Sequence, residues 1–92
     1  MTATLTLPAQ LSVQLGRAPF DALTQALDQL PAGSPAVLDA APLQHFDSSA
    51  LALILGLKRH CQAAGRELRV QGLPERLCGL AQLYGVAELI GA

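Results

Sequence analysis

Short apolar segments with a period of two alternate with longer segments of helical period along the chain. Strand periodicity covers Thr2 to Leu7, Leu11 to Leu15, Ala36 to Asp39 and Glu67 to Gln71. Helical periodicity covers Pro19 to Leu30, Asp47 to Ala64 and Pro74 to Tyr84. Strands that alternate with helices form mostly parallel sheets covered by helices. We therefore predict an α/β fold in the order β-β-α-β-α-β-α, with about four or five strands in the sheet.

The first two strand segments follow each other closely and are predicted to pair as a hairpin. In the first helix the apolar side chains recur at helical spacing and the acidic ones lie opposite, so the apolar side faces inward. The third helix is predicted to have an inner face of Leu77, Leu80, Ala81 and Tyr84. The last segment, Val86 to Ile90, fits either a strand or a helical turn, and both assignments stay open.

Composition restricts the size of the fold and the class of protein. The 92 residues, of which 51% are hydrophobic and nineteen are leucine, predict one domain over residues 1–92 with an aliphatic core. A net charge of −1 and three aromatic residues provide neither the positive field nor the stacking surface that nucleic acid binding requires. The longest apolar run, Ala50 to Leu57, is far shorter than the ~20 residues of a membrane span.

Cofactor, metal and catalytic chemistry find no support in the sequence. Cys61 and Cys78 stand apart from each other and from histidines at zinc-ligand spacing, so we expect two buried thiols in a reducing cytoplasm. No glycine-rich phosphate loop occurs, and no signal peptide is visible at the N-terminus. His45, Asp47 and Ser48 lie close together but lack the glycines of a nucleophile elbow, which argues against a hydrolase.

The segment Asp47 to Ala64 is the strongest helix signal, with Asp47 as N-cap and Gly65 as the stop. Its inward stripe consists of Ala50, Ile54, Leu57, Cys61 and Ala64. The opposite side carries Ser48, Ala52, Leu55, Arg59 and Gln62, flanked by Leu51, Gly56 and Ala63. Either the alanines tolerate solvent as good helix formers, or a second chain covers the exposed apolar area that Leu51 and Leu55 add.

Ser48 follows the cap at the positive end of this helix. A phosphate there would meet free backbone N–H groups and place about two negative charges beside the contact side, which weakens docking. Ordinary capping chemistry is the alternative explanation of this serine. Farther along, Lys58, Arg59 and His60 together with Arg66 and Arg69 form a basic cluster, which is either solvated or faces acidic residues of a partner.

The segment Phe46 to Leu55, with the sequence FDSSALALIL, resembles the signature loop and helix of STAS domains, whose pattern is Asp-Ser/Thr-x-Gly-Leu. The segments Val70 to Leu73 and Leu80 to Val86 are similar to those of MlaB-like STAS proteins, the small cytoplasmic subunits of bacterial phospholipid ABC transporters. The element order from Asp39 onward agrees with this family. Ala50 departs from the pattern, because the family usually has glycine there.

The resemblance implies a STAS fold and a non-enzymatic adaptor without cofactor or metal. It implies docking on the cytoplasmic ATPase of a phospholipid transporter through the Ser48 end of the long helix, in the cytoplasm beside the inner membrane. The alternative is an anti-sigma factor antagonist that a partner kinase phosphorylates on Ser48. The uncovered apolar area also allows the isolated chain to form a homodimer. The expected contact residues are Asp47, Ser48, Ser49, Leu51, Ala52, Leu55 and Arg59.

Overall fold

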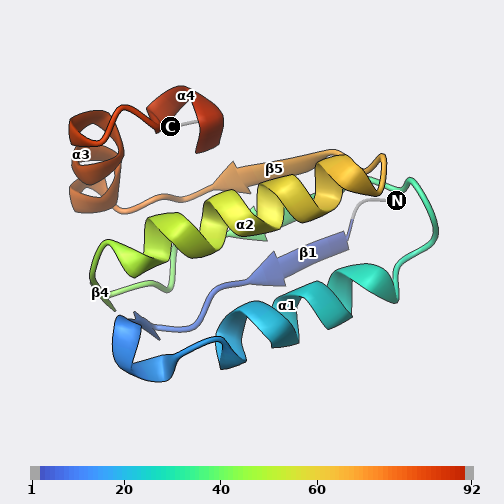
Figure 1. The fold of residues 1–92 in the computed structure, drawn as a ribbon, viewed down its shortest axis with the longest axis horizontal. Helices are drawn as coiled ribbons and strands as arrows, with labels where there is room; N and C mark the ends of the chain where they lie inside the picture. The colour runs from blue at the N-terminus through green and yellow to red at the C-terminus, as the bar shows by residue number, and fades with distance from the viewer. Residues whose placement is uncertain (1–2, 91–92) are drawn as a thin grey trace.

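A computed structural model describes residues 3–90 of the chain. It forms two layers, in which helices pack on one face of a sheet (Figure 1). The main sheet has three parallel strands in the order β1, β3 and β5, which are Ala3–Thr6, Ala36–Asp39 and Leu68–Gln71. Within this sheet, a long helix lies between β1 and β3 in the sequence, and another lies between β3 and β5. The predicted α/β fold with a parallel sheet is therefore confirmed.

The register of the main sheet separates a buried face from a polar face. The rows of the buried face are Ala3, Ala36 and Leu68, and then Leu5, Leu38 and Val70. The rows of the polar face are Thr4, Val37 and Arg69, and then Thr6, Asp39 and Gln71. The alternation of burial along β1 and β3 follows these rows. Helices therefore cover one face of the sheet, and the other face presents mainly polar side chains.

A second, smaller sheet consists of β2 (Gln10–Leu11) and β4 (His45–Phe46), which pair in parallel. The predicted hairpin is therefore wrong, since β1 pairs with β3 and β2 pairs with β4. The predicted strand from residue 11 to residue 15 is also wrong beyond its first residue, because a 3-10 helix, η1, occupies Val13–Leu15. The chain turns here so that the next helix returns over the sheet, and alternation alone does not reveal this turn. Thr2 lies outside the described residues.

Helices α1 (Ala18–Asp28) and α2 (Ser49–Ala63) lie side by side on the sheet and run opposite to the strands (Figure 1). Helices α3 (Glu75–Leu83) and α4 (Ala87–Ile90) pack beyond β5, and α4 also contacts α2. The segment with two open assignments is therefore helical at its end, where the side chain of Ile90 is fully buried. The helices α1 and α2 both begin at the edge of the sheet where the strands end.

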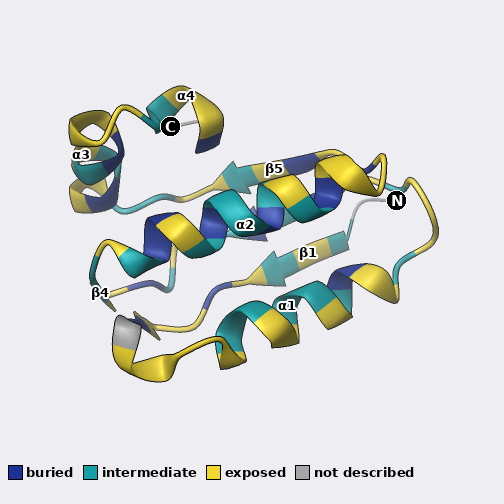
Figure 2. Ribbon diagram, in the orientation of Figure 1, coloured by how far each residue is buried: buried dark blue, intermediate teal, exposed yellow. Residues whose placement is uncertain are grey.

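The core between sheet and helices is aliphatic, as expected (Figure 2). Its largest fully buried side chains are Leu7, Leu27, Leu38, Ile54, Leu57, Leu77, Ile90 and Cys61. The inner face predicted for the third helix is confirmed for Leu77 and Ala81, which are fully buried. It is wrong for Tyr84, which is 57% exposed because α3 ends before it and Gly85, with a φ of 73°, turns the chain away.

Both cysteines are free thiols, but only one of them is fully buried. Burial raises the pKa of the Cys61 thiol, so this group stays protonated and unreactive at neutral pH. Cys78 is half-buried in α3, which corrects the expectation of two buried thiols.

Arg66 joins two loops at the edge of the sheet where the strands begin. Its Nη1 atom donates hydrogen bonds to the carbonyl oxygen and the hydroxyl of Ser34, at 2.5 and 2.9 Å. Ser34 belongs to the loop between α1 and β3, and Arg66 to the loop between α2 and β5. The arginine is only 8% exposed, and its hydrogen bonds to Ser34 connect the two loops at this end of the molecule.

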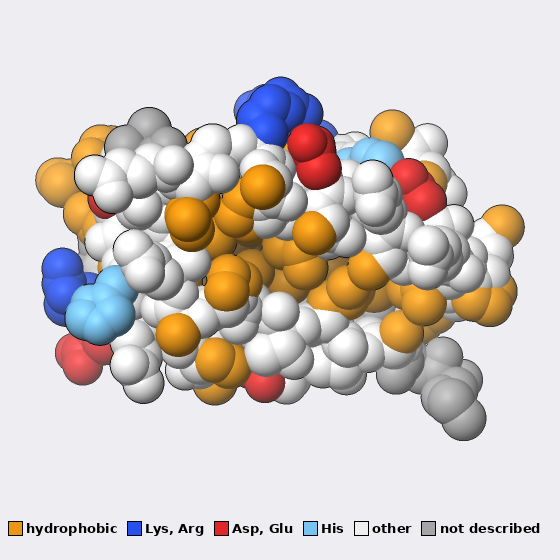
Figure 3. Space-filling view, turned by 90° about the horizontal axis from the view of Figure 1, so that it is seen from below, with side chains coloured by type: hydrophobic (Ala, Val, Ile, Leu, Met, Phe, Trp, Pro, Cys, Tyr) orange, Lys and Arg blue, Asp and Glu red, His pale blue; other side chains and the backbone are white. Residues whose placement is uncertain are grey.

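Seen from the side that α1 and the edge strand β1 form, hydrophobic side chains gather in a hollow (Figure 3). These two elements carry half-buried Leu5 and Leu23, which pack against the core. The large apolar side chains with the greatest exposure lie elsewhere, on η1 and near the C-terminus: Leu15, Leu83, Tyr84 and Leu89. Within residues 3–90, no helix has the length and apolar character needed to cross a membrane.

Candidate docking site at the start of the long helix

Asp47 shapes the start of α2. Its Oδ1 atom accepts a hydrogen bond from the backbone N–H of Ser49 at 2.8 Å and another from the Ser49 hydroxyl. The predicted capping role of Asp47 is thus confirmed, although the helix begins at Ser49. Ser48, between them, has helical backbone angles and an exposed side chain. No bond of its hydroxyl is found within residues 3–90, so an exposed hydroxyl stands next to the cap.

The backbone amides of the first turn of α2 all have partners. Those of Ser49 and Ala50 donate to the carboxylate and the carbonyl of Asp47, the latter at 3.1 Å. The next two amides donate to the carbonyl of Ser48, at 3.1 and 3.4 Å. The expectation that a phosphate on Ser48 would meet free N–H groups is therefore wrong for these four amides. Such a phosphate would also lie next to the like charge of the Asp47 carboxylate.

The outward side of α2 carries exposed and half-buried residues (Figure 2). Ala52 and Arg59 are exposed, whereas Leu55 is half-buried and packs against the core. The expectation that Leu51 adds exposed apolar area is wrong, because its side chain is only 4% exposed. Since α2 has α1 on one flank and α4 on the other, its buried arc is wider than the sheet alone requires.

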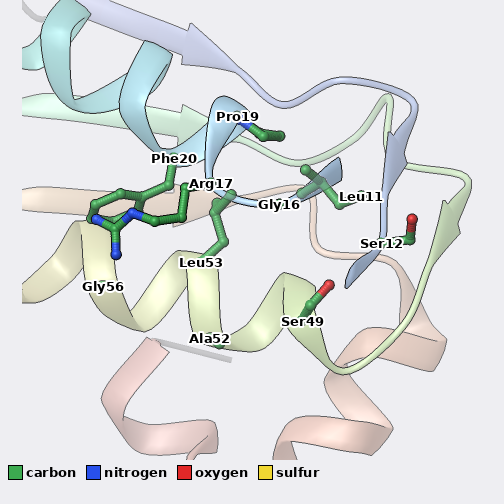
Figure 4. Close-up of a pocket in the computed structure, with 10 residues that line it drawn as sticks. All are labelled: Leu11, Ser12, Gly16, Arg17, Pro19, Phe20, Ser49, Ala52, Leu53 and Gly56. Atoms are coloured by element: carbon green, nitrogen blue, oxygen red, sulfur yellow. The ribbon is translucent and has the colours of Figure 1, made fainter. Parts of the chain in front are cut away.

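A groove of about 390 Å³ lies between the start of α1 and the N-terminal half of α2 (Figure 4). Ser12 and Ser49 stand at one end of it, and Arg17 and Phe20 at the other. The remaining lining is apolar or small and consists of Leu11, Gly16, Pro19, Ala52, Leu53 and Gly56. The groove is thus an apolar slot with polar groups at both ends, and it begins next to Ser48.

Gly56 allows one wall of this groove to form. A Cβ atom at this position would lie 2.8 Å from Cε1 of Phe20, which is too close for any ordinary contact. Because glycine has no Cβ atom, the aromatic ring packs directly on the surface of α2. The guanidinium carbon of Arg17 lies above the same ring, 5.2 Å from its centroid, in a cation–π contact.

Ser12 brings a polar atom without a partner to the groove. Its Oγ atom is buried and makes no hydrogen bond within the described part of the chain. A buried hydroxyl without a partner costs about 1–3 kcal/mol, so nearly all such groups in proteins are bonded to protein or water. Because this atom is almost completely covered, a group that enters the groove does not reach it.

A second groove, of about 400 Å³, lies on the opposite flank of α2 against α4. It is lined by Leu55, Lys58, Arg59, Gln62, Arg66, Leu68 and Leu89. Lys58 and Arg59 form no salt bridge within residues 3–90. The flank toward α4 therefore carries two adjacent positive charges, whereas the flank toward α1 is mainly apolar.

The other members of the predicted basic cluster are engaged elsewhere. His60 Nε2 lies 2.7 Å from Asp28 Oδ1 and links α2 to the end of α1. Arg66 binds the loop between α1 and β3, and Arg69 Nε lies 3.9 Å from Glu67 Oε1 on the polar face of the sheet. The structure thus divides the predicted cluster and leaves Lys58 and Arg59 together on α2.

The residues considered for hydrolysis do not form a catalytic arrangement. His45 is exposed on β4, and no hydrogen bond joins it to Ser48 within residues 3–90. Asp47 holds the start of α2 instead. The described residues also contain no group of three or more His, Cys, Asp or Glu side chains that is suited to a metal ion.

The comparison with known families agrees with this geometry. The sequence model of the family described as Mlab, STAS domain matches residues 8–91, which include the cap, both grooves and all four helices. The chain belongs to the STAS domain family. This match confirms the expected family and fold. STAS domains are regulatory modules that bind other proteins. No curated protein matches the sequence closely enough to count as a relative.

Sequence reasoning placed the expected docking site on α2 alone and did not predict the adjoining groove, one wall of which comes from the start of α1. Arg17 and Phe20 are more than thirty residues away from Ala52, so no local pattern connects them. One signal was available, because a glycine inside a helix often marks the close approach of a neighbouring group. Gly56 is such a glycine, and the neighbouring group is the ring of Phe20.

Proposed function

We propose that this STAS domain is a non-enzymatic adaptor that docks on the cytoplasmic ATPase of a phospholipid ABC transporter of the Mla type. Docking uses the Ser48 end of α2. The observation that carries the proposal is an exposed, unbonded hydroxyl beside a flat helix side and an apolar groove, in a domain of the MlaB-type STAS family. Ser48, Ala52 and Arg59 contact the ATPase directly in this proposal.

The remaining expected contact residues have supporting roles. Asp47 and Ser49 fix the loop that presents Ser48. Leu55 borders the contact area as a half-buried side chain, and Leu51 supports the helix from below because it is buried. The small side chain of Ala52, which is exposed, lets a partner approach α2 closely, which a larger side chain would prevent.

The second candidate function is that of an anti-sigma factor antagonist controlled by a kinase. The exposed hydroxyl of Ser48 favours it, because a kinase needs access to the side chain. The Asp47 carboxylate and the occupied amides disfavour a phosphate at the same place. We therefore place the adaptor first.

Capture from cells distinguishes the two functions. The tagged chain is used to isolate partners from detergent-solubilised membranes and from the cytosol, and the partners are identified by mass spectrometry. We expect an ABC ATPase together with its permease from the membrane fraction. Recovery of a soluble anti-sigma kinase without any transporter subunit would replace the adaptor with the antagonist.

The variant Ser48→Glu tests the site. It places a charge in the contact but at a helix start, where a carboxylate is tolerated, so unfolding free energy changes by about 0.5 kcal/mol or less. Affinity for the captured ATPase falls about tenfold or more, measured by calorimetry. Gln71→Glu adds the same charge on the polar face of the sheet and retains wild-type affinity. Equal affinities of both variants would remove Ser48 from the interface.

A further inference from the structure

The groove between α1 and α2 is suited to a particular kind of chemical group. Its middle is formed by apolar and small residues, so an aliphatic side chain that enters it exchanges water for apolar contacts. Figure 4 shows Leu53 reaching from α2 toward the segment of Gly16, with the ring of Phe20 above Gly56. A volume of about 390 Å³ is at the lower end of the range of ligand sites, which suits a few side chains rather than a large cofactor.

Arg17 adds a charge requirement at one end of the groove. The face of its guanidinium group is held by the Phe20 ring, and its only ionic contact in residues 3–90 is with Asp21 at 3.9 Å. At 79% exposure this contact leaves the N–H donors of the arginine available to an acceptor. A carboxylate is the acceptor that matches a guanidinium group best, because two parallel hydrogen bonds form.

The charges around α2 point to the same kind of partner. Lys58 and Arg59, on the other flank, form no salt bridge within residues 3–90, while Asp28 is engaged by His60. Positive groups therefore border α2 on both sides, although Arg17 keeps its exposed contact with Asp21, and a surface that covers the helix meets them together. An acidic surface is complementary to this arrangement, which favours its association and orientation.

We propose that the groove between α1 and α2 binds a segment of the partner ATPase in which an aliphatic side chain stands next to an aspartate or glutamate. The aliphatic group lies between Leu11 and Leu53, and the carboxylate pairs with Arg17. This inference rests on the proposed function and names the chemistry that the ATPase must present.

A second copy of the chain is the competing occupant. The exposed side chains of Glu88 and Leu89 on α4 offer the same pair of an acid and an aliphatic group, and Leu89 is 61% exposed. Such a contact would be head-to-tail, because α4 and the groove are different surfaces, and it would give open chains of molecules rather than a closed dimer. Light scattering of the purified chain and of Leu89→Ser distinguishes the two occupants.

The main test fills the groove and compares two alanines. Ala52→Phe occupies the groove from an exposed position and lowers affinity for the purified ATPase about tenfold or more. Ala63→Phe is the matched control, since it lies on a similar side of α2, exposed and about 16 Å farther along. We expect it to bind within about twofold of wild type. An equal loss in both variants would assign binding to the helix side in general and overturn the groove.

A pair of arginines tests the charge. Arg17→Gln lowers affinity about threefold to tenfold and makes binding less sensitive to salt, because a carboxylate contact is lost. Arg69→Gln removes an equally exposed arginine from the polar face of the sheet and leaves affinity and salt dependence unchanged. An unchanged salt dependence in Arg17→Gln would show that no carboxylate pairs with this arginine.

Cross-linking identifies the occupant. A photo-crosslinking residue at position 52 is expected to join a peptide of the ATPase in which an aliphatic residue neighbours an aspartate or glutamate. A cross-linked peptide without an acidic residue, or one that contains α4 of a second copy, would overturn the inference. If Ser48→Glu abolishes binding while Ala52→Phe does not, the groove inference fails and the adaptor function stands. If no ATPase is captured at all, both fail.

Discussion

The inward side and the outward side of α2 both contain alanine and leucine, yet they have different properties. Ala50, Ile54 and Leu57 on the inward side are fully buried against the sheet and its core. On the outward side Ala52 is exposed, and Gly56 is covered by one aromatic ring from α1. Alanine therefore packs into the core on the inward side and remains accessible to a partner on the outward side. Changes on the inward side should cost folding, and changes on the outward side should cost binding only.

The largest effect is expected on the inward side. Ile54→Ala removes a fully buried side chain from the centre of the core and lowers the unfolding free energy by about 3 kcal/mol. Gln62→Ala, at an exposed position of the same helix, changes it by about 0.5 kcal/mol or less. Chemical denaturation of both variants measures the difference. A comparable loss in Gln62→Ala would show that the outward side is also structural.

An intermediate effect on the unfolding free energy is expected at the N-terminal cap of α2. Asp47→Ala removes the cap of the first turn and costs about 1 kcal/mol of unfolding free energy. Asp21→Ala is the control, because this aspartate also lies in a first helical turn, and its carboxylate contacts only the exposed Arg17 within residues 3–90. Its loss should cost about 0.5 kcal/mol or less. Equal values for the two variants would mean that the Asp47 bonds to Ser49 do not stabilise the helix.

The smallest effect separates a glycine that is packed from one that is free. Gly79→Ala, in α3, meets no atom within 4 Å and should raise the unfolding free energy by about 0.5–1 kcal/mol, since alanine favours helices. Gly56→Ala loses this gain, because its methyl group must displace the Phe20 ring. Thermal unfolding compares the two variants directly. A stabilised Gly56→Ala would show that the ring moves away at no cost.

The sequence was informative where one local period coincided with one buried face. The spacing from Ala50 to Ala64 predicted the inward stripe of α2, which is buried as far as Cys61 but exposed at Ala64, and Asp47 marked its cap. It was misleading where tertiary neighbours decided the outcome. Leu51 is buried because α2 has helices on both flanks, and no pattern within α2 reports its neighbours. The residues after Leu11 alternate like a strand, but the chain must turn there to reach α1.

The candidate site was predictable only on one side for the same reason. The loop around Ser48 and the small residues of α2 are contiguous in sequence, so their pattern is visible. The groove needs Arg17 and Phe20, which become neighbours of Ala52 only after α1 and α2 have packed on the sheet. The partners of charged side chains could not be predicted from the sequence either, because the bond between His60 and Asp28 joins residues of two different helices.

The parallel pairings also set an order for folding on the ribosome. β1 has no neighbour until β3 is synthesised, and β2 has none until β4 ends at Phe46. Because parallel strands need a crossover between them, the nascent chain cannot complete either sheet from its N-terminal third. The N-terminal third of the polypeptide therefore leaves the exit tunnel with unpaired strands, which chaperones can bind during this interval.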